Sequence, residues 1–143
     1  MSRKETPLTR AYWKKIGGTL IEEFFVVKKT NTSSPRCIDG LIIPDGEHRI
    51  LKQSEINING KDIICIQTKA GRLGMYLMGQ ALFSYHLLTK YHEPKSVTSV
   101  ALCTRDDSVL RPLLERYPDM RVEIIVLNGI KTDSDNQSGS ERI

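Results

Sequence analysis

The stretch Ile63-Ile64-Cys65-Ile66-Gln67-Thr68-Lys69 decides the fold, because an apolar strand ends here in polar residues. In a β-strand, residues i and i+2 share a face. Gln67 and Lys69 are therefore expected side by side at the carboxyl end of this strand. Upstream, the apolar run 36–43 is interrupted by one carboxylate, that of Asp39. On adjacent strands, a carboxylate, an amide oxygen and an ammonium group would meet and could hold a divalent metal and a phosphodiester.

These residues resemble the active site of the PD-(D/E)xK nuclease superfamily, in which an Asp early on one strand precedes Glu/Gln-x-Lys on the next. Carried over by position, Asp39 corresponds to the metal-binding Asp, Gln67 to the Glu/Gln position and Lys69 to the catalytic Lys. The resemblance implies Mg²⁺ or Mn²⁺ held by Asp39, the Gln67 side-chain oxygen and the Thr68 backbone carbonyl. Gln67 departs from the commonest pattern, since an amide oxygen ligates a hard cation but removes one negative charge.

A second Asp competes for the first position of the motif, because Pro44-Asp45 spells the letters of the superfamily's name. Asp39 is preferred because it lies inside an apolar strand, whereas Asp45 lies between Pro and Gly, where turns place Asp for backbone reasons. An Asp inside an apolar strand is costly unless it is paired. The alternative role of Asp39 is therefore a structural salt bridge, for instance with Arg36 or Lys69.

The first helix is expected to supply a further acid. Thr6-Pro7 is a typical helix start, and apolar residues at helical spacing predict a helix through about Glu23. Glu23 lies at the edge of that apolar stripe, and the resemblance gives an acidic residue on this helix a role as a metal or water ligand. The alternative is a solvated Glu near a helix end. The apolar stripe consists of Trp13, Ile16, Gly17, Leu20, Ile21 and Phe24.

The remaining pattern predicts strands at about 24–29, 97–102 and 122–127, an additional strand at 48–52, and helices at about 73–91 and 108–116. The fold class is α/β, with a mixed β-sheet flanked by helices in the order α-β-β-β-α-β and an appended α-β. The resemblance implies a three-layer restriction endonuclease-like core. Residues 1–127 are expected to form one such domain, followed by a flexible polar tail at 128–143.

The charge of the chain favours a polyanionic partner, since the formal net charge is +4 and the sequence pI is about 9.0. Arg72, just beyond the strand, is a candidate for neutralising a neighbouring phosphate, and Lys14 is a second cationic candidate. Gln80 resembles a Gln that several exonuclease-like branches use to contact nucleic acid or to organise the site. The alternatives are a solvated basic face and, for Gln80, a polar residue at the edge of a buried helix face.

Other chemistries lack their sequence signals. The three cysteines show no C-x-x-C pairing and are expected to be small buried residues, and the three histidines have no metal-ligand spacing. The chain contains no phosphate-binding loop and no nucleophile elbow. No secretory signal and no apolar stretch of membrane-spanning length is visible, so a cytoplasmic location without a membrane partner is expected.

The sequence therefore predicts a Mg²⁺-dependent nuclease-like protein that hydrolyses phosphodiester bonds of nucleic acid, with DNA favoured over RNA, in repair or restriction. A homodimer is left open. The principal alternative is a catalytically decayed nucleic-acid-binding or protein-interaction module on the same fold. Gln67, which stands where the motif most often has an acid, supports this alternative. A third alternative is an α/β domain with no nucleic-acid role.

Overall fold

A computed structural model describes residues 5–127, so the expected tail at 128–143 lies outside the described residues. These residues form one six-stranded sheet in the order β3-β1-β2-β4-β5-β6. The elements are α1 (Glu5–Ile16), β1 (Thr19–Val27), β2 (Arg36–Ile43), β3 (Ile50–Leu51), a short 3-10 helix (Gln53–Glu55), β4 (Asp62–Arg72), α2 (Met75–Tyr91), β5 (Ser96–Arg105), α3 (Leu110–Glu115) and β6 (Met120–Ile124).

The sheet is mixed, as predicted. Strand β2 runs antiparallel to both β1 and β4, whereas β4, β5 and β6 are parallel to one another. Helices join the parallel strands, because a crossover must return the chain to the same end of the sheet. The predicted α/β class is confirmed at this level.

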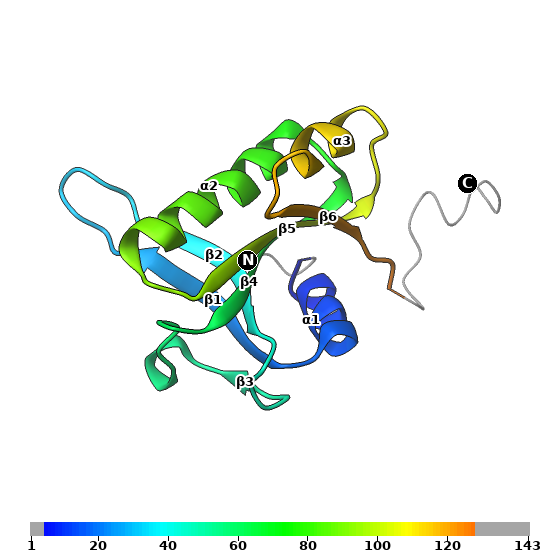
Figure 1. The fold of residues 1–143 in the computed structure, drawn as a ribbon. Coiled ribbons are helices and arrows are strands. Elements are labelled where there is room, and N and C mark those ends of the chain that lie inside the picture. Colours follow the sequence, from blue (N-terminus) through cyan, green and yellow to red (C-terminus); the bar gives the residue numbers. More distant parts are fainter. Residues whose placement is uncertain (1–4, 128–143) are drawn as a thin grey trace.

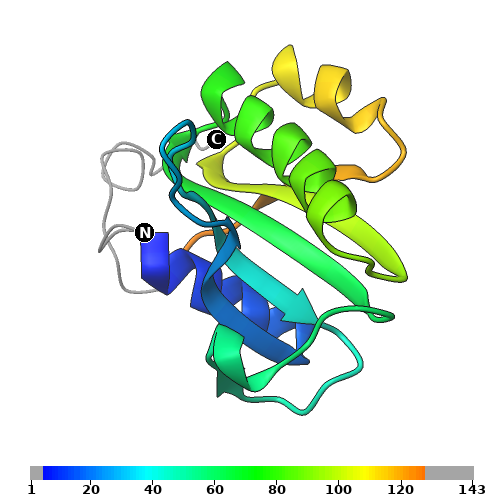
Figure 2. The same cartoon turned by 90° about the vertical axis from the view of Figure 1, so that its left-hand side faces the viewer.

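The helices cover both faces of the sheet. Figures 1 and 2 show α1 against one face and α2 with α3 against the other. On the α1 side, Tyr12 and Trp13 pack with Ile66 of β4, and on the α2 side Leu88 packs with Ile63 of the same strand. Burial on both faces explains why β4 and β5 are continuous apolar runs instead of alternating ones.

The predicted first helix through Glu23 is wrong, because α1 ends at Ile16. Gly17 and Gly18 follow with φ of +90° and +79°, and the Gly17 N–H donates to the Trp13 carbonyl at 2.7 Å. Left-handed glycines of this kind end helices. The apolar residues beyond them belong to β1, where they pack on the sheet. Their spacing also fits a helix, so the sequence pattern predicted one helix where the structure has a helix and a strand.

The other predicted elements are present with shifted ends. The additional strand at 48–52 is the two-residue β3, which lies parallel to β1 at the sheet edge. Gln53 prolongs this pairing, since its side-chain amide binds both the N–H and the carbonyl of Phe25 at 2.8 Å. No helix within residues 5–127 is long and apolar enough to cross a membrane.

Candidate functional site

The pairing of β2 with β4 stops partway along the two strands. Residues 40–42 pair with residues 64–66 backbone to backbone. Beyond Gly40, the Asp39 carboxylate replaces the backbone partner of β4, because its Oδ2 accepts a hydrogen bond from the Thr68 N–H at 2.9 Å. No ion pair joins Asp39 to Arg36 or Lys69 among the described residues, so the salt bridge given as the alternative role of Asp39 is not formed. The carboxylate stands where a backbone ladder would otherwise continue.

The Asp39 carboxyl lies in a half-buried position that favours its neutral form. Burial raises its pKa, the hydrogen bond from the Thr68 N–H opposes this, and the negative charges of Glu5 and Glu23 raise the pKa further. An acid whose pKa is raised by burial and by neighbouring carboxylates is a candidate functional group.

Glu5 is an acidic residue of this site that the sequence interpretation missed. It lies in the first turn of α1, and Thr9 follows one turn later on the same side of the helix. The Thr9 hydroxyl contacts the Thr68 hydroxyl at 2.8 Å, so this end of α1 lies against the strand that holds Asp39. Glu5 precedes Thr6-Pro7, the expected helix start, and was therefore placed outside the helix.

Glu23 lies on β1 and not on a helix, and the structure brings it opposite Asp39. Glu22 pairs with Gly40 and Phe24 with Ile38, so Glu23 and Asp39 lie at the same level of the two strands, between these pairs. Glu23 has φ of +56° and is the only non-glycine residue with positive φ within 5–127. Such a conformation costs about 1–3 kcal/mol. The backbone strain thus coincides with the carboxylates.

Gln67 is buried, with 5% of its surface exposed. Its Nε2 donates to the Ser84 hydroxyl at 2.8 Å, and that hydroxyl donates to the Gln80 carbonyl at 2.6 Å. Because the Ser84 hydroxyl already donates its hydrogen to the Gln80 carbonyl, it can only accept a hydrogen bond from Gln67. The NH₂ group of the Gln67 amide therefore faces Ser84. The buried Oε1 of Gln67 has no hydrogen-bond partner among the described residues. A buried oxygen left unpaired costs about 1–3 kcal/mol.

Ser84 is a second residue that the sequence interpretation missed. It lies on α2 in the buried stripe with Leu77, Ala81 and Leu88. A serine within an otherwise apolar helix face was the available signal, because a buried hydroxyl needs a partner. Gln80 takes part through its backbone carbonyl, and its side chain is half-buried at the edge of that face.

Thr68 and Lys69 follow the alternation expected of a strand. The Thr68 side chain lies toward α1, where it meets Thr9, whereas Lys69 is exposed two residues beyond Gln67. The carbonyl of a strand residue points to the same edge as its N–H, so the Thr68 carbonyl points toward the gap beside Asp39. The backbone atom expected as a metal ligand is thus on the open side of β4.

The predicted cationic contacts are separated by the fold. Arg72 is exposed at the end of β4, in register with Arg105, and its Nη1 donates to the Asp106 carbonyl at 2.8 Å. Lys14 lies in the last turn of α1. Nine residues separate it from Glu5, which is about 14 Å along a helix. The structure therefore does not bring Lys14 to the candidate site.

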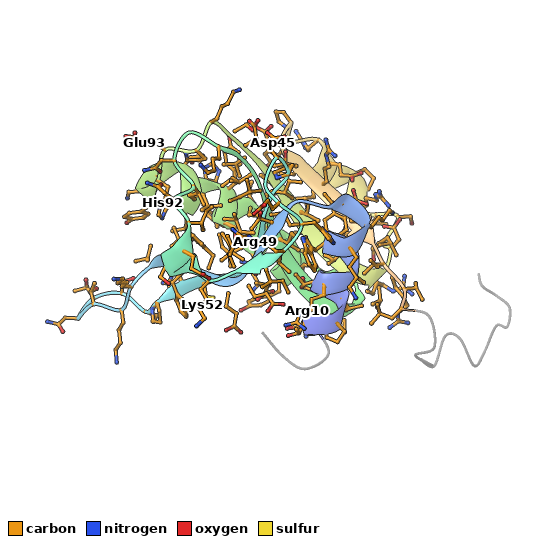
Figure 3. The ribbon with its side chains drawn as sticks, turned by 90° about the horizontal axis from the view of Figure 1, so that it is seen from below. Arg10, Asp45, Arg49, Lys52, His92 and Glu93 are labelled. Carbon is orange, nitrogen blue, oxygen red and sulfur yellow. The ribbon has the colours of Figure 1, made fainter. Side chains whose placement is uncertain are left out.

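Asp45 lies in the exposed turn after β2, as expected, with the Gly46 N–H donating to the Ile43 carbonyl at 3.0 Å. Figure 3 places it well apart from Arg10 on α1. The Arg10 guanidinium binds the Glu22 carboxylate through two hydrogen bonds, of 2.6 and 3.0 Å. Since Glu22 adjoins Glu23 on β1, Arg10 marks the sheet end that carries the site, and Asp45 is at the other end.

The ionisable groups form no cluster of three metal ligands, either around Asp39 or elsewhere. Within residues 5–127, no three His, Cys, Asp or Glu side chains are gathered closely enough for one metal ion. Cys65 and Cys103 are buried as predicted, whereas Cys37 is exposed, contrary to expectation. Its thiol is still partly desolvated, and this together with the charges of Glu23 and Asp39 raises its pKa to about 11. The Cys37 thiol therefore stays protonated at neutral pH.

Comparisons with protein-family models, with curated proteins and with solved structures found no match to this chain.

Proposed function

We propose that the chain is a Mg²⁺- or Mn²⁺-dependent nuclease of the PD-(D/E)xK type that hydrolyses phosphodiester bonds, with DNA as the favoured substrate, in repair or restriction. The observation that carries this proposal is the interrupted junction of β2 and β4. There the Asp39 carboxylate binds the Thr68 N–H, next to the buried and unpaired Gln67 oxygen. The mixed sheet and its helix order agree with the restriction endonuclease-like core that the resemblance implies.

The residues at this junction fit a hard divalent cation. Mg²⁺ prefers oxygen ligands, and the Asp39 carboxylate, Gln67 Oε1 and the Thr68 carbonyl are all oxygens. Glu5 and Glu23 add negative charge near Asp39, which offsets the charge that an amide at position 67 lacks. When bound, such an ion lowers the pKa of water and polarises the scissile phosphate.

The side chains are held before any substrate arrives. The Thr68 N–H fixes Asp39, and Ser84 fixes the amide of Gln67. Lys69 projects from the exposed end of β4, where its ammonium group would orient the attacking water and stabilise the extra negative charge on the phosphate oxygens in the transition state. Donors positioned in advance are effective because they need no reorganisation during the reaction.

The proposal is tested by cleavage of branched, single-stranded and double-stranded DNA and RNA with Mg²⁺ or Mn²⁺. Wild type is compared with Asp39→Ala and Lys69→Ala, and Asp45→Ala is the matched control on the turn. We expect metal-dependent cutting that is lost in the first two variants and kept in the third. Cutting that survives Asp39→Ala would show that the candidate site does not catalyse the cleavage.

The alternative of a catalytically decayed binding or interaction module is favoured by two features, the amide at position 67 and the lack of a three-acid cluster within 5–127. The same panel distinguishes it from a nuclease. No cutting, with salt-sensitive binding unchanged in both site variants, would support a nucleic-acid-binding module. No cutting and no binding would rule out nucleic acid as the substrate or partner of this protein.

A further inference from the structure

Three aromatic side chains are exposed on α2, Tyr91 at its end and two others that lie on one line beside the candidate site. Tyr76 is 80% exposed and Phe83 is 62% exposed. They are seven residues apart, which places them on one line along the helix. Phe83 directly precedes Ser84, the residue that holds Gln67. The line formed by Tyr76 and Phe83, called here the aromatic ridge, therefore borders the site on the α2 side of the sheet.

Two segments beside the aromatic ridge, residues 24–38 and 63–92, contain cations and no acids, and α2 lies wholly within the second. The acids Glu23 and Asp39 directly flank the first segment, at the candidate site. Lys90 lies seven residues beyond Phe83 and continues the same line. The loop between β1 and β2, which projects from the body in Figure 1, carries further charges next to β2. The exposed cations of the two segments are Lys28, Lys29, Arg36, Lys69, Arg72 and Lys90.

A second exposed apolar surface shows what distinguishes the aromatic ridge. On α3 and its flanks, Val109, Leu113 and Tyr117 are also exposed. The acids Asp106, Asp107 and Glu115 lie within this surface, where Arg111 binds two of them. The charges there are mixed, which suits a polyanion less well. The aromatic ridge combines exposed rings with cations on a helix that carries no acid, and single-strand binding sites use rings and cations together.

Unpaired bases fit the aromatic ridge better than a duplex does. Each base offers a π-face on which an aromatic ring can stack, whatever the sequence, while the basic groove follows the phosphates. In a duplex these faces are already covered by neighbouring bases. Two rings on one line with Lys90 beyond them provide two stacking positions followed by a phosphate contact.

We propose that Tyr76 and Phe83 stack on the unpaired bases of a single-stranded DNA segment whose phosphates lie along Lys90 and the cations of the β1–β2 loop. This inference rests on the proposed function, because it makes α2 the platform that leads a single strand to the site at Asp39. It narrows the substrate class to single strands or to duplexes with unpaired ends or flaps.

The test is the fluorescence anisotropy of a short labelled single strand and of its duplex, both in EDTA, so that binding is measured without cleavage. We expect wild type to prefer the single strand. The double variant Tyr76→Leu, Phe83→Leu should weaken single-strand binding about 30-fold or more, since stacking contributes about 1–3 kcal/mol per base and two rings are lost. Tyr76→Phe keeps a ring and should bind as wild type does, and Tyr117→Leu is the matched control on α3.

Three results would overturn the inference: equal single-strand affinity in wild type and the double variant, a preference of wild type for the duplex, or no binding by wild type. The proposed function fails separately, if cleavage is absent or is unaffected by Asp39→Ala. In that event ring-dependent binding would still establish the aromatic ridge as a single-strand site. All substituted side chains are exposed, so the variants should remain folded.

Discussion

The two halves of the β2–β4 junction differ in what holds them together. In the paired half, residues 40–42 and 64–66 form a regular ladder whose apolar side chains are almost all buried. In the open half, the ladder is replaced by the Asp39 carboxylate, an unpaired Gln67 oxygen and the exposed Lys69. The paired half stabilises the fold, whereas the open half leaves one buried atom, Gln67 Oε1, without a hydrogen-bond partner among residues 5–127. Groups that are costly to the fold are candidates for a functional role.

The largest expected effect is on activity, in the open half. Lys69→Met should lower the single-turnover rate of metal-dependent cleavage about 10²- to 10³-fold, because it removes a preorganised charge from the transition state. Lys95→Met is the control, since Lys95 immediately precedes β5, near the other end of the parallel strands. A wild-type rate for Lys69→Met would mean that the open half is not catalytic.

The next effect is on stability, at the end of the paired half. A Cβ on Gly18 would overlap the Ile43 carbonyl, and φ is +79°, so Gly18→Ala should lower the free energy of unfolding by about 3 kcal/mol or more. Gly60 has φ of +76° with open space around it, so Gly60→Ala should cost only about 1–2 kcal/mol of backbone strain. Urea unfolding measures both. Equal losses would refute the close packing at Gly18.

A smaller effect is expected where α2 supports the open half. Ser84→Ala removes the 2.8 Å acceptor of the buried Gln67 amide and leaves only the Cys37 carbonyl at 3.5 Å, so it should cost about 1–3 kcal/mol of unfolding free energy. Adding Gln67→Met should recover much of this loss, because both polar partners are then gone. If the double variant is no more stable than Ser84→Ala, the hydrogen bond between the two side chains does not account for the cost.

The smallest effect concerns pH. Burial raises the folded-state pKa of Asp39 above its ordinary value of 3.8, so the folded protein binds this proton more tightly than the unfolded chain. Stability linked to Asp39 is then present below pH 3.8 and is lost as the pH rises through the folded pKa. Asp39→Asn, in EDTA, should therefore melt above wild type at neutral pH. This gain should fade in acid, and thermal melts that show the opposite trend would contradict the assignment.

The paired half and the parallel strands were predictable from sequence, because burial on one or both faces leaves a direct apolar pattern in the chain. Thus β4, α2 and β5 were placed close to their observed ranges. The end of α1 was not, since Leu20 and Phe24 fit a helical period as well as they fit β1. Only the left-handed backbone at Gly17 and Gly18 separates the two elements, and that backbone is stabilised by tertiary contacts.

The open half was predictable in part. Strand alternation identified Gln67 and Lys69, and an Asp inside an apolar run identified Asp39. Glu5 and Ser84 were missed because their contacts with the site arise from packing of α1 and α2 on the sheet. Lys14 was included on its charge, although helix length places it away from Asp39.

The most direct test of the open half as a metal site is a calorimetric titration of Mn²⁺ into wild type, Asp39→Asn and Asp45→Asn. We expect wild type and Asp45→Asn to bind one Mn²⁺ with the same affinity, and Asp39→Asn to lose it, since only Asp39 lies at the interrupted junction. Equal binding by all three proteins, or binding by none, would contradict the account.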